Sequence, residues 1–530
     1  MGGLAAAFAL AAHGLPVTLL ERHATPGGRM RRIEVAGRSL DAGPTVFTMR
    51  WVFEALFARA GLALGEHLPL RRAELLARHS WVGSESLDLF ADVERSSEAI
   101  ARFASARDAD NYRSFASKSE AMFDTLDATF MRASRPTPLT LGLRAGVRGV
   151  PGLLRTEPFS TLWASLARTF DDPRLRQLFA RYATYCGSSP FKAPATLMLI
   201  AHVERAGVWL VEGGMQRLAE TLDERLEALG AERRYGCGVA RIETGAGGRR
   251  VSGVTLESGE TLPADAVVFN GDTAALTAGL LGEALRGAAR PRREPSLSAV
   301  TRCQVARVSG YPLAHHTVFF GGDYVDEFDS VFERRAMSAD PTVYVCAQDR
   351  SGAVDARPAV ADGGDANAVG GEGEDGGREA RGRGEAIGGR NATGYGGATQ
   401  GVERDGAGSV RERLFSLVNA PARAHTAEEI DAAETRMREA LARHGLALDD
   451  EAGRTITSPD DFAALFPATD GALYGRPTHG WAGSFSRPGS RSRVHGLYLA
   501  GGSVHPGAGV PMATLSGQLA ADAIIADAKR

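Results

Sequence analysis

A glycine-rich loop near the end of the chain constrains the fold most strongly. The apolar run at 497–499 predicts a short buried strand. Residues 501–511 contain four glycines and two prolines, which excludes regular secondary structure. From Met512 onward the sequence is Ala-rich with helical spacing. The pattern predicts a strand, a tight glycine loop and a helix in succession.

A strand, loop and helix of this kind are suited to binding a flat ligand that gains negative charge. Glycines allow backbone N–H groups to approach closely, and a helix start adds partial positive charge. A flavin needs both, because its N1–C2=O edge becomes anionic when the ring accepts a hydride. Gly501, Gly502, Val510 and Met512 are therefore candidate flavin-binding residues. The alternative is an ordinary turn before a C-terminal helix.

The N-terminal residues predict part of a dinucleotide-binding unit. Residues 1–14 predict a helix rich in small side chains, and 17–21 predict a buried strand that ends in an acid. In a Rossmann unit, G-x-G-x-x-G opens the helix and an acid about 20 residues later binds ribose. Gly3 matches the last glycine and Glu21 the acid. The sequence lacks the strand that would precede this helix.

Three motifs together resemble the bacterial-type carotenoid desaturases, the phytoene desaturase family of FAD enzymes. The motifs are Glu21 with Gly27-Gly28-Arg29, Asp41-Ala-Gly-Pro-Thr45, and His505-Pro-Gly-Ala-Gly-Val510. The resemblance covers nearly the whole chain and implies FAD as the cofactor. The cofactor-binding residues that it implies, together with those found above, are Gly2, Gly3, Glu21, Arg22, Gly28, Arg29, Val239, Asp272, Gly501, Gly502, Val510 and Met512. No catalytic residue or metal ligand is identified.

Two further stretches, 182–194 and 343–349, are most similar to the 1-hydroxycarotenoid 3,4-desaturases. That resemblance implies a double bond introduced at the 3,4 position of acyclic carotenoids that carry a 1-hydroxyl or 1-methoxyl group. The residues themselves indicate only an FAD oxidoreductase with an apolar substrate. Three alternatives remain: a phytoene desaturase, an amine- or protoporphyrinogen-oxidase-like flavoprotein, and an N-terminally degenerate carotenoid-binding protein. Because the first turn over the pyrophosphate is absent, we expect the chain as given to bind FAD poorly.

The expected fold is α/β, with a Rossmann-like FAD-binding domain interleaved with a substrate domain of helices and an antiparallel sheet. The FAD-binding domain is expected at 1–75, 205–295 and 475–530. A helical lid is expected at 76–204, including one helix over 159–179, and the rest of the substrate domain at 296–474. Within the latter, 351–409 is rich in Gly and mixed charges and is predicted to be a disordered insert.

Charge and cysteine usage limit the partners and the compartment. The net charge of −3 implies no general attraction to nucleic acid. The four cysteines are scattered without a C-x-x-C motif, which argues against a disulfide framework or zinc site and favours a reducing cytoplasm. The chain contains no unbroken apolar run of transmembrane length.

The segment 136–154 is apolar and basic and contains no acid, which is typical of a helix that lies in a membrane interface. We therefore expect peripheral attachment to the cytoplasmic face of the inner membrane; a packed lid helix is the alternative. The expected electron acceptor is a quinone or oxygen. Tyr182 and Tyr185 are candidate channel residues, and His315, His316 and His505 are candidate proton acceptors, each with an ordinary structural role as the alternative.

Overall fold

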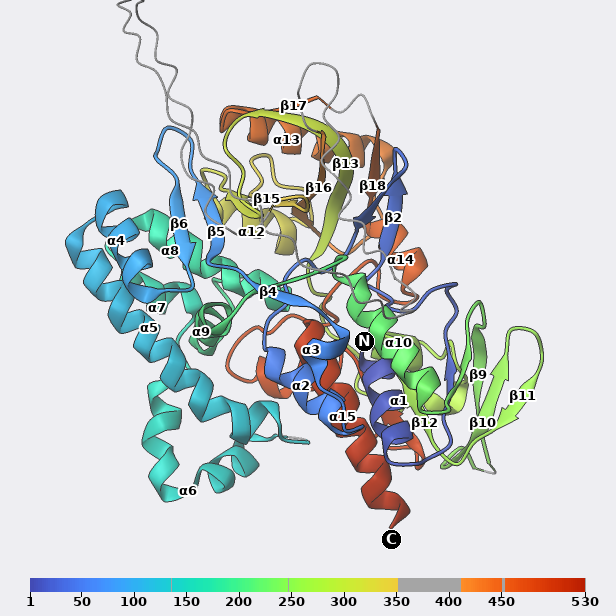
Figure 1. Ribbon diagram of the computed structural model, residues 1–530. Coiled ribbons are helices and arrows are strands. Elements are labelled where there is room, and N and C mark those ends of the chain that lie inside the picture. The colour runs from blue at the N-terminus through green and yellow to red at the C-terminus, as the bar shows by residue number, and fades with distance from the viewer. Residues whose placement is uncertain (135, 246, 351–410, 450–452, 530) are drawn as a thin grey trace, which may run out of the picture. The chain divides into compact units, whose positions relative to one another are not determined.

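The computed structural model describes residues 1–134, 136–245, 247–350, 411–449 and 453–529 (Figure 1). The segment predicted as a disordered insert, 351–409, lies outside the described residues. The described residues on both sides of it belong to one compact unit. The domain boundaries expected from the sequence stay a prediction.

Helices make up the largest share of this unit. The α-helices are α1 (Gly2–Ala12), α2 (Arg50–Ala58), α3 (Leu64–His67), α4 (Val93–Phe103), α5 (Ala106–Leu126), α6 (Pro138–Arg155), α7 (Leu162–Thr169), α8 (Pro173–Ala180), α9 (Leu199–Ala206), α10 (Gln216–Ala228), α11 (Thr273–Thr277), α12 (Tyr324–Phe332), α13 (Ala427–Arg443), α14 (Pro459–Leu465) and α15 (Val510–Ala528). Short 3₁₀ or π turns are η1 (Asp127–Met131), η2 (Arg181–Cys186), η3 (Ala195–Met198), η4 (Glu283–Leu285) and η5 (Gly483–Phe485).

The strands are mostly short. They are β1 (Thr18–Leu20), β2 (Arg32–Val35), β3 (Arg38–Asp41), β4 (Leu70–Arg72), β5 (Leu75–Ser80), β6 (Leu87–Phe90), β7 (Trp209–Val211), β8 (Glu232–Arg234), β9 (Val239–Thr244), β10 (Val251–Leu256), β11 (Thr261–Pro263), β12 (Val267–Phe269), β13 (Ser298–Gly310), β14 (His316–Phe319), β15 (Val343–Ala347), β16 (Arg411–Ala420), β17 (Leu446–Asp449), β18 (Arg454–Thr457) and β19 (Leu497–Leu499).

Two pairs of parallel strands lie near the predicted cofactor-binding motifs, one after α1 and one before the closing glycine loop. β1 pairs in parallel with β8, and β12 pairs in parallel with β19. These are two separate pairs, and no described strand joins β1 to β12. Helices α1, α10 and α15 lie side by side (Figure 1) and share one apolar core through Leu4, Leu218 and Leu515. The expected helix and strand before residue 21, and the strand, loop and helix around 501–511, are present. The prediction that the first strand is buried is wrong: Thr18 is exposed and Leu19 and Leu20 are half-buried, because β1 pairs with β8 alone among the described strands.

The second sheet contains eight strands, in the order β17-β13-β16-β15-β14-β5-β6 with β18 also paired to β13. All its pairs are antiparallel except β14 with β5. Helix α13 packs on it through Met437 and Leu441, against Val300 and Leu414. The expected antiparallel sheet is present, and it includes β5 and β6 from the region expected to be a lid.

The helix predicted over 159–179 is wrong, because two helices form there. α7 ends at Thr169 and α8 begins at Pro173. Asp172 caps α8 by accepting a hydrogen bond from the backbone N–H of Arg174 at 2.7 Å, and Pro173 occupies the first turn, where its missing N–H costs nothing. An acid followed by proline is a helix-start signal that the apolar periodicity had obscured.

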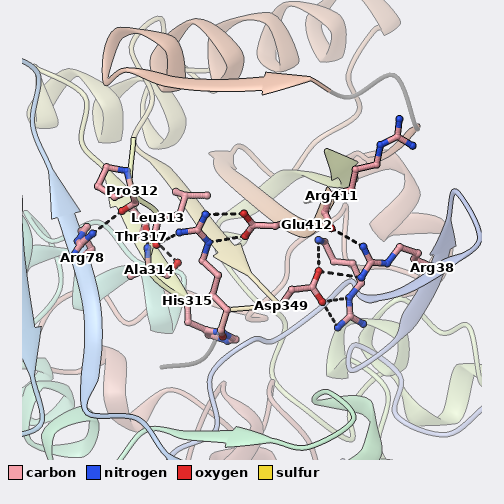
Figure 2. Close-up of polar contacts among 12 residues, drawn as sticks. Arg38, Arg78, Pro312, Leu313, Ala314, His315, Thr317, Asp349, Arg411 and Glu412 are labelled. Carbon is pink, nitrogen blue, oxygen red and sulfur yellow. Dashed lines mark hydrogen bonds and ion pairs between the residues drawn. The ribbon is translucent and has the colours of Figure 1, made fainter. Parts of the chain in front are cut away.

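The strands on either side of residues 351–410 are held together by charged side chains (Figure 2). β15 and β16 pair with Ala347 opposite Leu414. Just beyond the paired ends, Glu412 receives two hydrogen bonds from Arg350, at 2.6 and 2.7 Å. Oδ1 of Asp349 lies 2.8 Å from Nε and 2.7 Å from Nη2 of Arg413 and accepts from the guanidinium. The pair between Arg350 and Glu412 is bidentate, and both ion pairs hold the strands together at the point where the described chain is interrupted.

Candidate functional site

One large cavity, about 1660 Å³ in volume, runs through the described unit. All of the residues predicted to bind the cofactor contribute to its wall; they are Gly2, Gly3, Glu21, Arg22, Gly28, Arg29, Val239, Asp272, Gly501, Gly502, Val510 and Met512. The fold thus brings together residues from both ends and the middle of the chain. Their contacts with a cofactor stay a prediction.

The start of α1 and the closing glycine loop meet at this wall. A Cβ atom on Gly2 would lie 2.5 Å from Oδ1 of Asn270 and 2.7 Å from the backbone nitrogen of Gly501. The backbone N–H of Gly501 donates to Oγ of Ser516 at 3.1 Å. Only glycine fits at residue 2, because any side chain would overlap the loop. Sequence analysis did not identify Ser516, whose role follows from a tertiary contact with the loop.

Glu21 and Val239 lie on neighbouring parts of the same wall. Oε1 of Glu21 accepts a hydrogen bond from the backbone of His23 at 2.9 Å, and the Glu21 carbonyl accepts one from Cys237 at 2.9 Å. Val239 begins β9 two residues later. The acid at the end of β1 is therefore held beside the strand that carries Val239. Ribose binding by Glu21 stays a prediction.

Two buried polar groups in the cavity wall test whether the site fits FAD. Among the described residues, Nε of Arg29 and Oδ2 of Asp272 have no hydrogen-bond partner. The other oxygen of Asp272 caps α11 by accepting from the N–H of Ala274 at 2.9 Å, and burial lowers the pKa of Arg29. Buried polar groups are nearly always paired. A donor and an acceptor of this kind fit a ligand with phosphate, ribose and heteroaromatic groups, as FAD has.

Asp41 joins the Asp41–Thr45 motif to the start of α10. Its Oδ2 accepts from the backbone of Met215 at 2.6 Å, and its Oδ1 from that of Gln216 at 3.3 Å. A Cβ atom on Gly214 would lie 2.4 Å from Oδ2. Burial is the main cause that raises the pKa of Asp41, against these hydrogen bonds. The motif therefore has a structural role that the sequence alone did not reveal.

Arg487 supports the closing loop from behind. It is buried and donates to three backbone carbonyls, those of Tyr474 at 3.1 Å, Arg476 at 2.8 Å and Gly502 at 2.7 Å. Burial lowers the pKa of Arg487 to about 10, so the guanidinium remains charged at neutral pH. Sequence analysis missed this residue, because a single arginine between a serine and a proline carries no periodic or motif signal.

The apolar part of the cavity extends to α6. Leu141 and Leu153 line the cavity, whereas Leu139 and Leu143 face solvent and are each 73% exposed. The helix is kinked at Gly146, which has a left-handed φ of 61°. α6 thus presents apolar side chains both to the cavity and to the outside. No helix in the described part of the chain is long and apolar enough to cross a membrane.

A charged cluster interrupts the apolar wall. Both oxygens of Glu204 accept hydrogen bonds from tyrosine hydroxyls, at 2.9 Å from Tyr182 and 2.5 Å from Tyr185. Nη1 of Arg181 donates to the hydroxyl of Tyr185 at 3.0 Å. Arg181, Tyr185 and Glu204 line the cavity, so the prediction for Tyr185 agrees with the structure. Tyr182 lies behind Glu204, is 3% exposed and does not contribute to the lining.

The three histidines predicted as candidate proton acceptors have structural partners instead. Among the described residues that line the cavity, none is His315, His316 or His505. Nε2 of His505 bonds to the carbonyl of Phe130 at 3.0 Å, and burial lowers the pKa of His505 to about 4. Nδ1 of His316 is 2.7 Å from the Tyr344 hydroxyl. These contacts support the structural interpretation of all three rings.

His315 and His316, together with Cys346, form a separate cluster at one end of the paired strands β14 and β15. One potential ligand atom from each lies within 4.8 Å of the other two. Nδ1 of His315 is 2.7 Å from the carbonyl oxygen of Arg350, beside the charged pairs that flank residues 351–410 (Figure 2). The contact between His315 and Arg350 ties the start of β14 to the residues that follow β15.

Comparison with known proteins identifies the family. Residues 1–305 match the family described as flavin containing amine oxidoreductase. The chain is 46% identical to the hydroxyneurosporene desaturase of Rubrivivax gelatinosus, over 99% of this chain and 92% of that protein. It is 42% identical to the hydroxyneurosporene desaturase of Cereibacter sphaeroides, over 99% and 96% of the two chains. The lycopene-forming phytoene desaturase of a Paracoccus species is 30% identical over 65% and 68%.

Solved structures support the fold. A putrescine oxidase superposes with a TM-score of 0.55 at 15% identity, covering 99% of this chain and 97% of that one. An oxidoreductase from Methanosarcina mazei superposes with a TM-score of 0.52 at 15% identity, over 99% and 98%. The mixed arrangement of helices and sheets is thus that of the flavin amine oxidases. The chain belongs to the flavin-containing amine oxidoreductases, uses FAD, and falls among the carotenoid desaturases of that family.

Proposed function

We propose that this protein introduces the 3,4 double bond into acyclic carotenoids that carry a 1-hydroxyl or 1-methoxyl group. The proposal rests on one observation: the wall of the same cavity includes both the predicted FAD-binding residues and apolar side chains of α6. Its volume of about 1660 Å³ exceeds the roughly 300–1,000 Å³ typical of a pocket for one small ligand. It has room for a dinucleotide and a long apolar substrate side by side.

Removal of two vicinal hydrogens needs an electron acceptor and a dry environment. FAD, when bound, supplies the acceptor for the hydride that leaves one allylic carbon, and the neighbouring carbon loses a proton as the double bond forms. The residues of the chain hold the reactants and exclude water. Arg29 and Asp272 offer hydrogen bonds to the cofactor, while Leu141 and Leu153 keep the substrate part of the cavity apolar. Exclusion of water from this part of the cavity prevents water from attacking the delocalised cation that develops on the polyene.

The same proposal includes attachment to the cytoplasmic face of the inner membrane. Leu139 and Leu143 are exposed on the helix whose other leucines line the cavity. Phe159, 78% exposed, lies 5.9 Å from the ring of Trp481, which is 47% exposed. An exposed apolar patch beside a cavity for an insoluble substrate is suited to a lipid surface. A membrane quinone or oxygen then reoxidises the reduced cofactor.

The closest alternative substrate is phytoene, and a direct comparison separates the two. FAD-loaded protein on liposomes receives phytoene and 1-hydroxyneurosporene in parallel, and the products are identified by chromatography and mass. We expect the hydroxylated substrate to gain one double bond at its hydroxylated end and phytoene to remain. Conversion of phytoene alone would assign the protein to the phytoene desaturases. Conversion of neither, with FAD bound, would reject both activities.

A further inference from the structure

A carotenoid with one oxygen presents a recognition problem that an apolar tunnel does not solve. A hydrocarbon wall binds the oxygenated and oxygen-free ends almost equally, whereas a site built to hydrogen-bond an oxygen discriminates strongly against a ligand without it. The proposed substrates carry either a hydroxyl or a methoxyl group. Both oxygens accept hydrogen bonds, but only the hydroxyl donates one. A residue that binds both must therefore be a donor.

Arg181 has the required donors in the cavity wall. Its contact with the Tyr185 hydroxyl is its one side-chain hydrogen bond to a described residue, and its Nε has no partner among them. A guanidinium has five N–H donors and no acceptor. Although burial lowers the pKa of Arg181, the neighbouring Tyr185 and Glu204 raise it overall, so the group is cationic. Arg181 therefore has a buried donor that no described residue accepts from.

Glu204 and the two tyrosines hold this cation in place. Each oxygen of Glu204 is occupied by a tyrosine hydroxyl, and burial raises the pKa of Tyr185, which therefore stays protonated. The guanidinium also lies over the Tyr185 ring, 5.2 Å from its centroid. Glu204 supplies a balancing charge without using the donors of Arg181 that have no partner. The cluster is thus an organised donor rather than a saturated ion pair.

The cluster lies near the predicted flavin wall. Cys186, next to Tyr185, lines the same cavity and lies close enough to Arg487 to be affected by its charge. Arg487 in turn holds the carbonyl of Gly502. On the other side, Tyr344 lies within electrostatic range of Tyr185 and hydrogen-bonds to Thr45 at 2.7 Å. An oxygen on carbon 1 is only a few bonds from the 3,4 bond, so its anchor must lie near the flavin.

We infer that Arg181, positioned by Tyr185 and Glu204, is the anchor that binds the terminal oxygen of the substrate and sets the preference for oxygenated carotenoids. This inference rests on the proposed function. Hydroxyl and methoxyl oxygens both accept from the guanidinium, whereas the hydrocarbon end leaves Nε of Arg181 without an acceptor. The anchor therefore disfavours neurosporene, which has the same chain without the oxygen.

The test compares kcat/KM for 1-hydroxyneurosporene, its 1-methoxy derivative and neurosporene in wild-type and variant holoenzymes. Arg181→Met alone leaves Glu204 without its counter-charge, so it is combined with Glu204→Gln; Tyr185→Phe is the milder second variant. We expect the ratio of oxygenated to hydrocarbon substrate to fall at least tenfold in the double variant and less in Tyr185→Phe. Arg168→Met, on the exposed face of α7, is the matched control and should leave the ratio unchanged.

The outcomes distinguish failure of the proposed anchor from failure of the proposed function. Turnover of the hydroxylated substrate by the wild type decides the function, and the change in substrate ratio decides the anchor. Equal losses on all substrates, or an unchanged ratio with normal FAD content, would show that the cluster is only structural. A wild type that prefers the hydroxyl more than tenfold over the methoxyl would indicate an acceptor in place of Arg181 and overturn the inference.

Discussion

The guanidinium of Arg487 donates from Nη1 to the carbonyl oxygen of Gly502 at 2.7 Å. This contact holds the backbone of a glycine in the closing loop. Two further donors of Arg487 hold the carbonyls of Tyr474 and Arg476. Because the side chain is only 7% exposed, water has little access to these carbonyls if the arginine is removed.

Arg487→Gln is therefore expected to lower both stability and FAD retention. Each buried carbonyl left unpaired costs about 1–3 kcal/mol, and the loop that it belongs to forms part of the predicted flavin wall. The ratio of FAD to protein after purification and the free energy of unfolding provide the measurements. Arg286→Gln, at a surface ion pair with Glu283, is the control. Wild-type FAD content in Arg487→Gln would contradict the supporting role.

Gly2→Ala should loosen the contact between α1 and the closing loop. The new methyl group would lie 2.7 Å from the nitrogen of Gly501, and such overpacking costs about 1–3 kcal/mol. Denaturant unfolding of the FAD-bound protein measures the loss. Gly287→Ala introduces the same methyl group where no atom lies within 4 Å, so it should be nearly neutral. Equal stability of the two variants would show that the loop adjusts freely.

Stability should fall as the pH drops from about 6.5 to about 4, because His505 is neutral in the fold. Burial lowers its pKa from 6.5 to about 4, so across this range the unfolded chain binds a proton that the folded chain does not. At about 1.36 kcal/mol per pKa unit, the loss from this residue is about 3 kcal/mol. His79, whose pKa burial lowers to about 3, adds an effect of the same sign.

His505→Gln isolates this contribution, since glutamine can still donate to the carbonyl of Phe130. Unfolding free energies of the variant, measured between pH 7 and pH 4, should decline less steeply than those of the wild type. His13→Gln, at an exposed position after α1, should leave the slope unchanged. Identical slopes for wild type and His505→Gln would mean that the ring is already protonated in the fold.

The exposed leucines of α6 provide the test of membrane attachment. Replacing Leu139 and Leu143 together by Asp removes apolar side chains that face outward and leaves the cavity residues Leu141 and Leu153 in place. We expect most of the variant to remain in the supernatant when liposomes are sedimented. Val82→Asp changes an equally apolar side chain, 57% exposed in another region, and should sediment like the wild type. Co-sedimentation of the α6 variant would reject this segment as the anchor.

The sequence predicted local elements better than the contacts between distant segments. Glycine spacing, the acid at the end of β1 and the resemblance to the carotenoid desaturases together predicted one site for Gly2, Glu21 and Gly501, and all three line the same cavity. Asp41 could not be assigned, since it caps backbone groups far away in the sequence. Arg487 was missed because its contact with the closing loop follows from no sequence motif. Arg181 and Glu204 were missed because they meet, through Tyr185, only by tertiary packing.

A single-turnover experiment without an electron acceptor tests most directly whether one cavity holds FAD and the carotenoid together. FAD-loaded protein is mixed with excess 1-hydroxyneurosporene under anaerobic conditions. The extracted carotenoids are then quantified by chromatography. We predict one newly desaturated molecule per bound FAD, because each hydride removed from the substrate reduces one cofactor. Absence of product, or product well in excess of the FAD present, would contradict a direct transfer between carotenoid and flavin in this cavity.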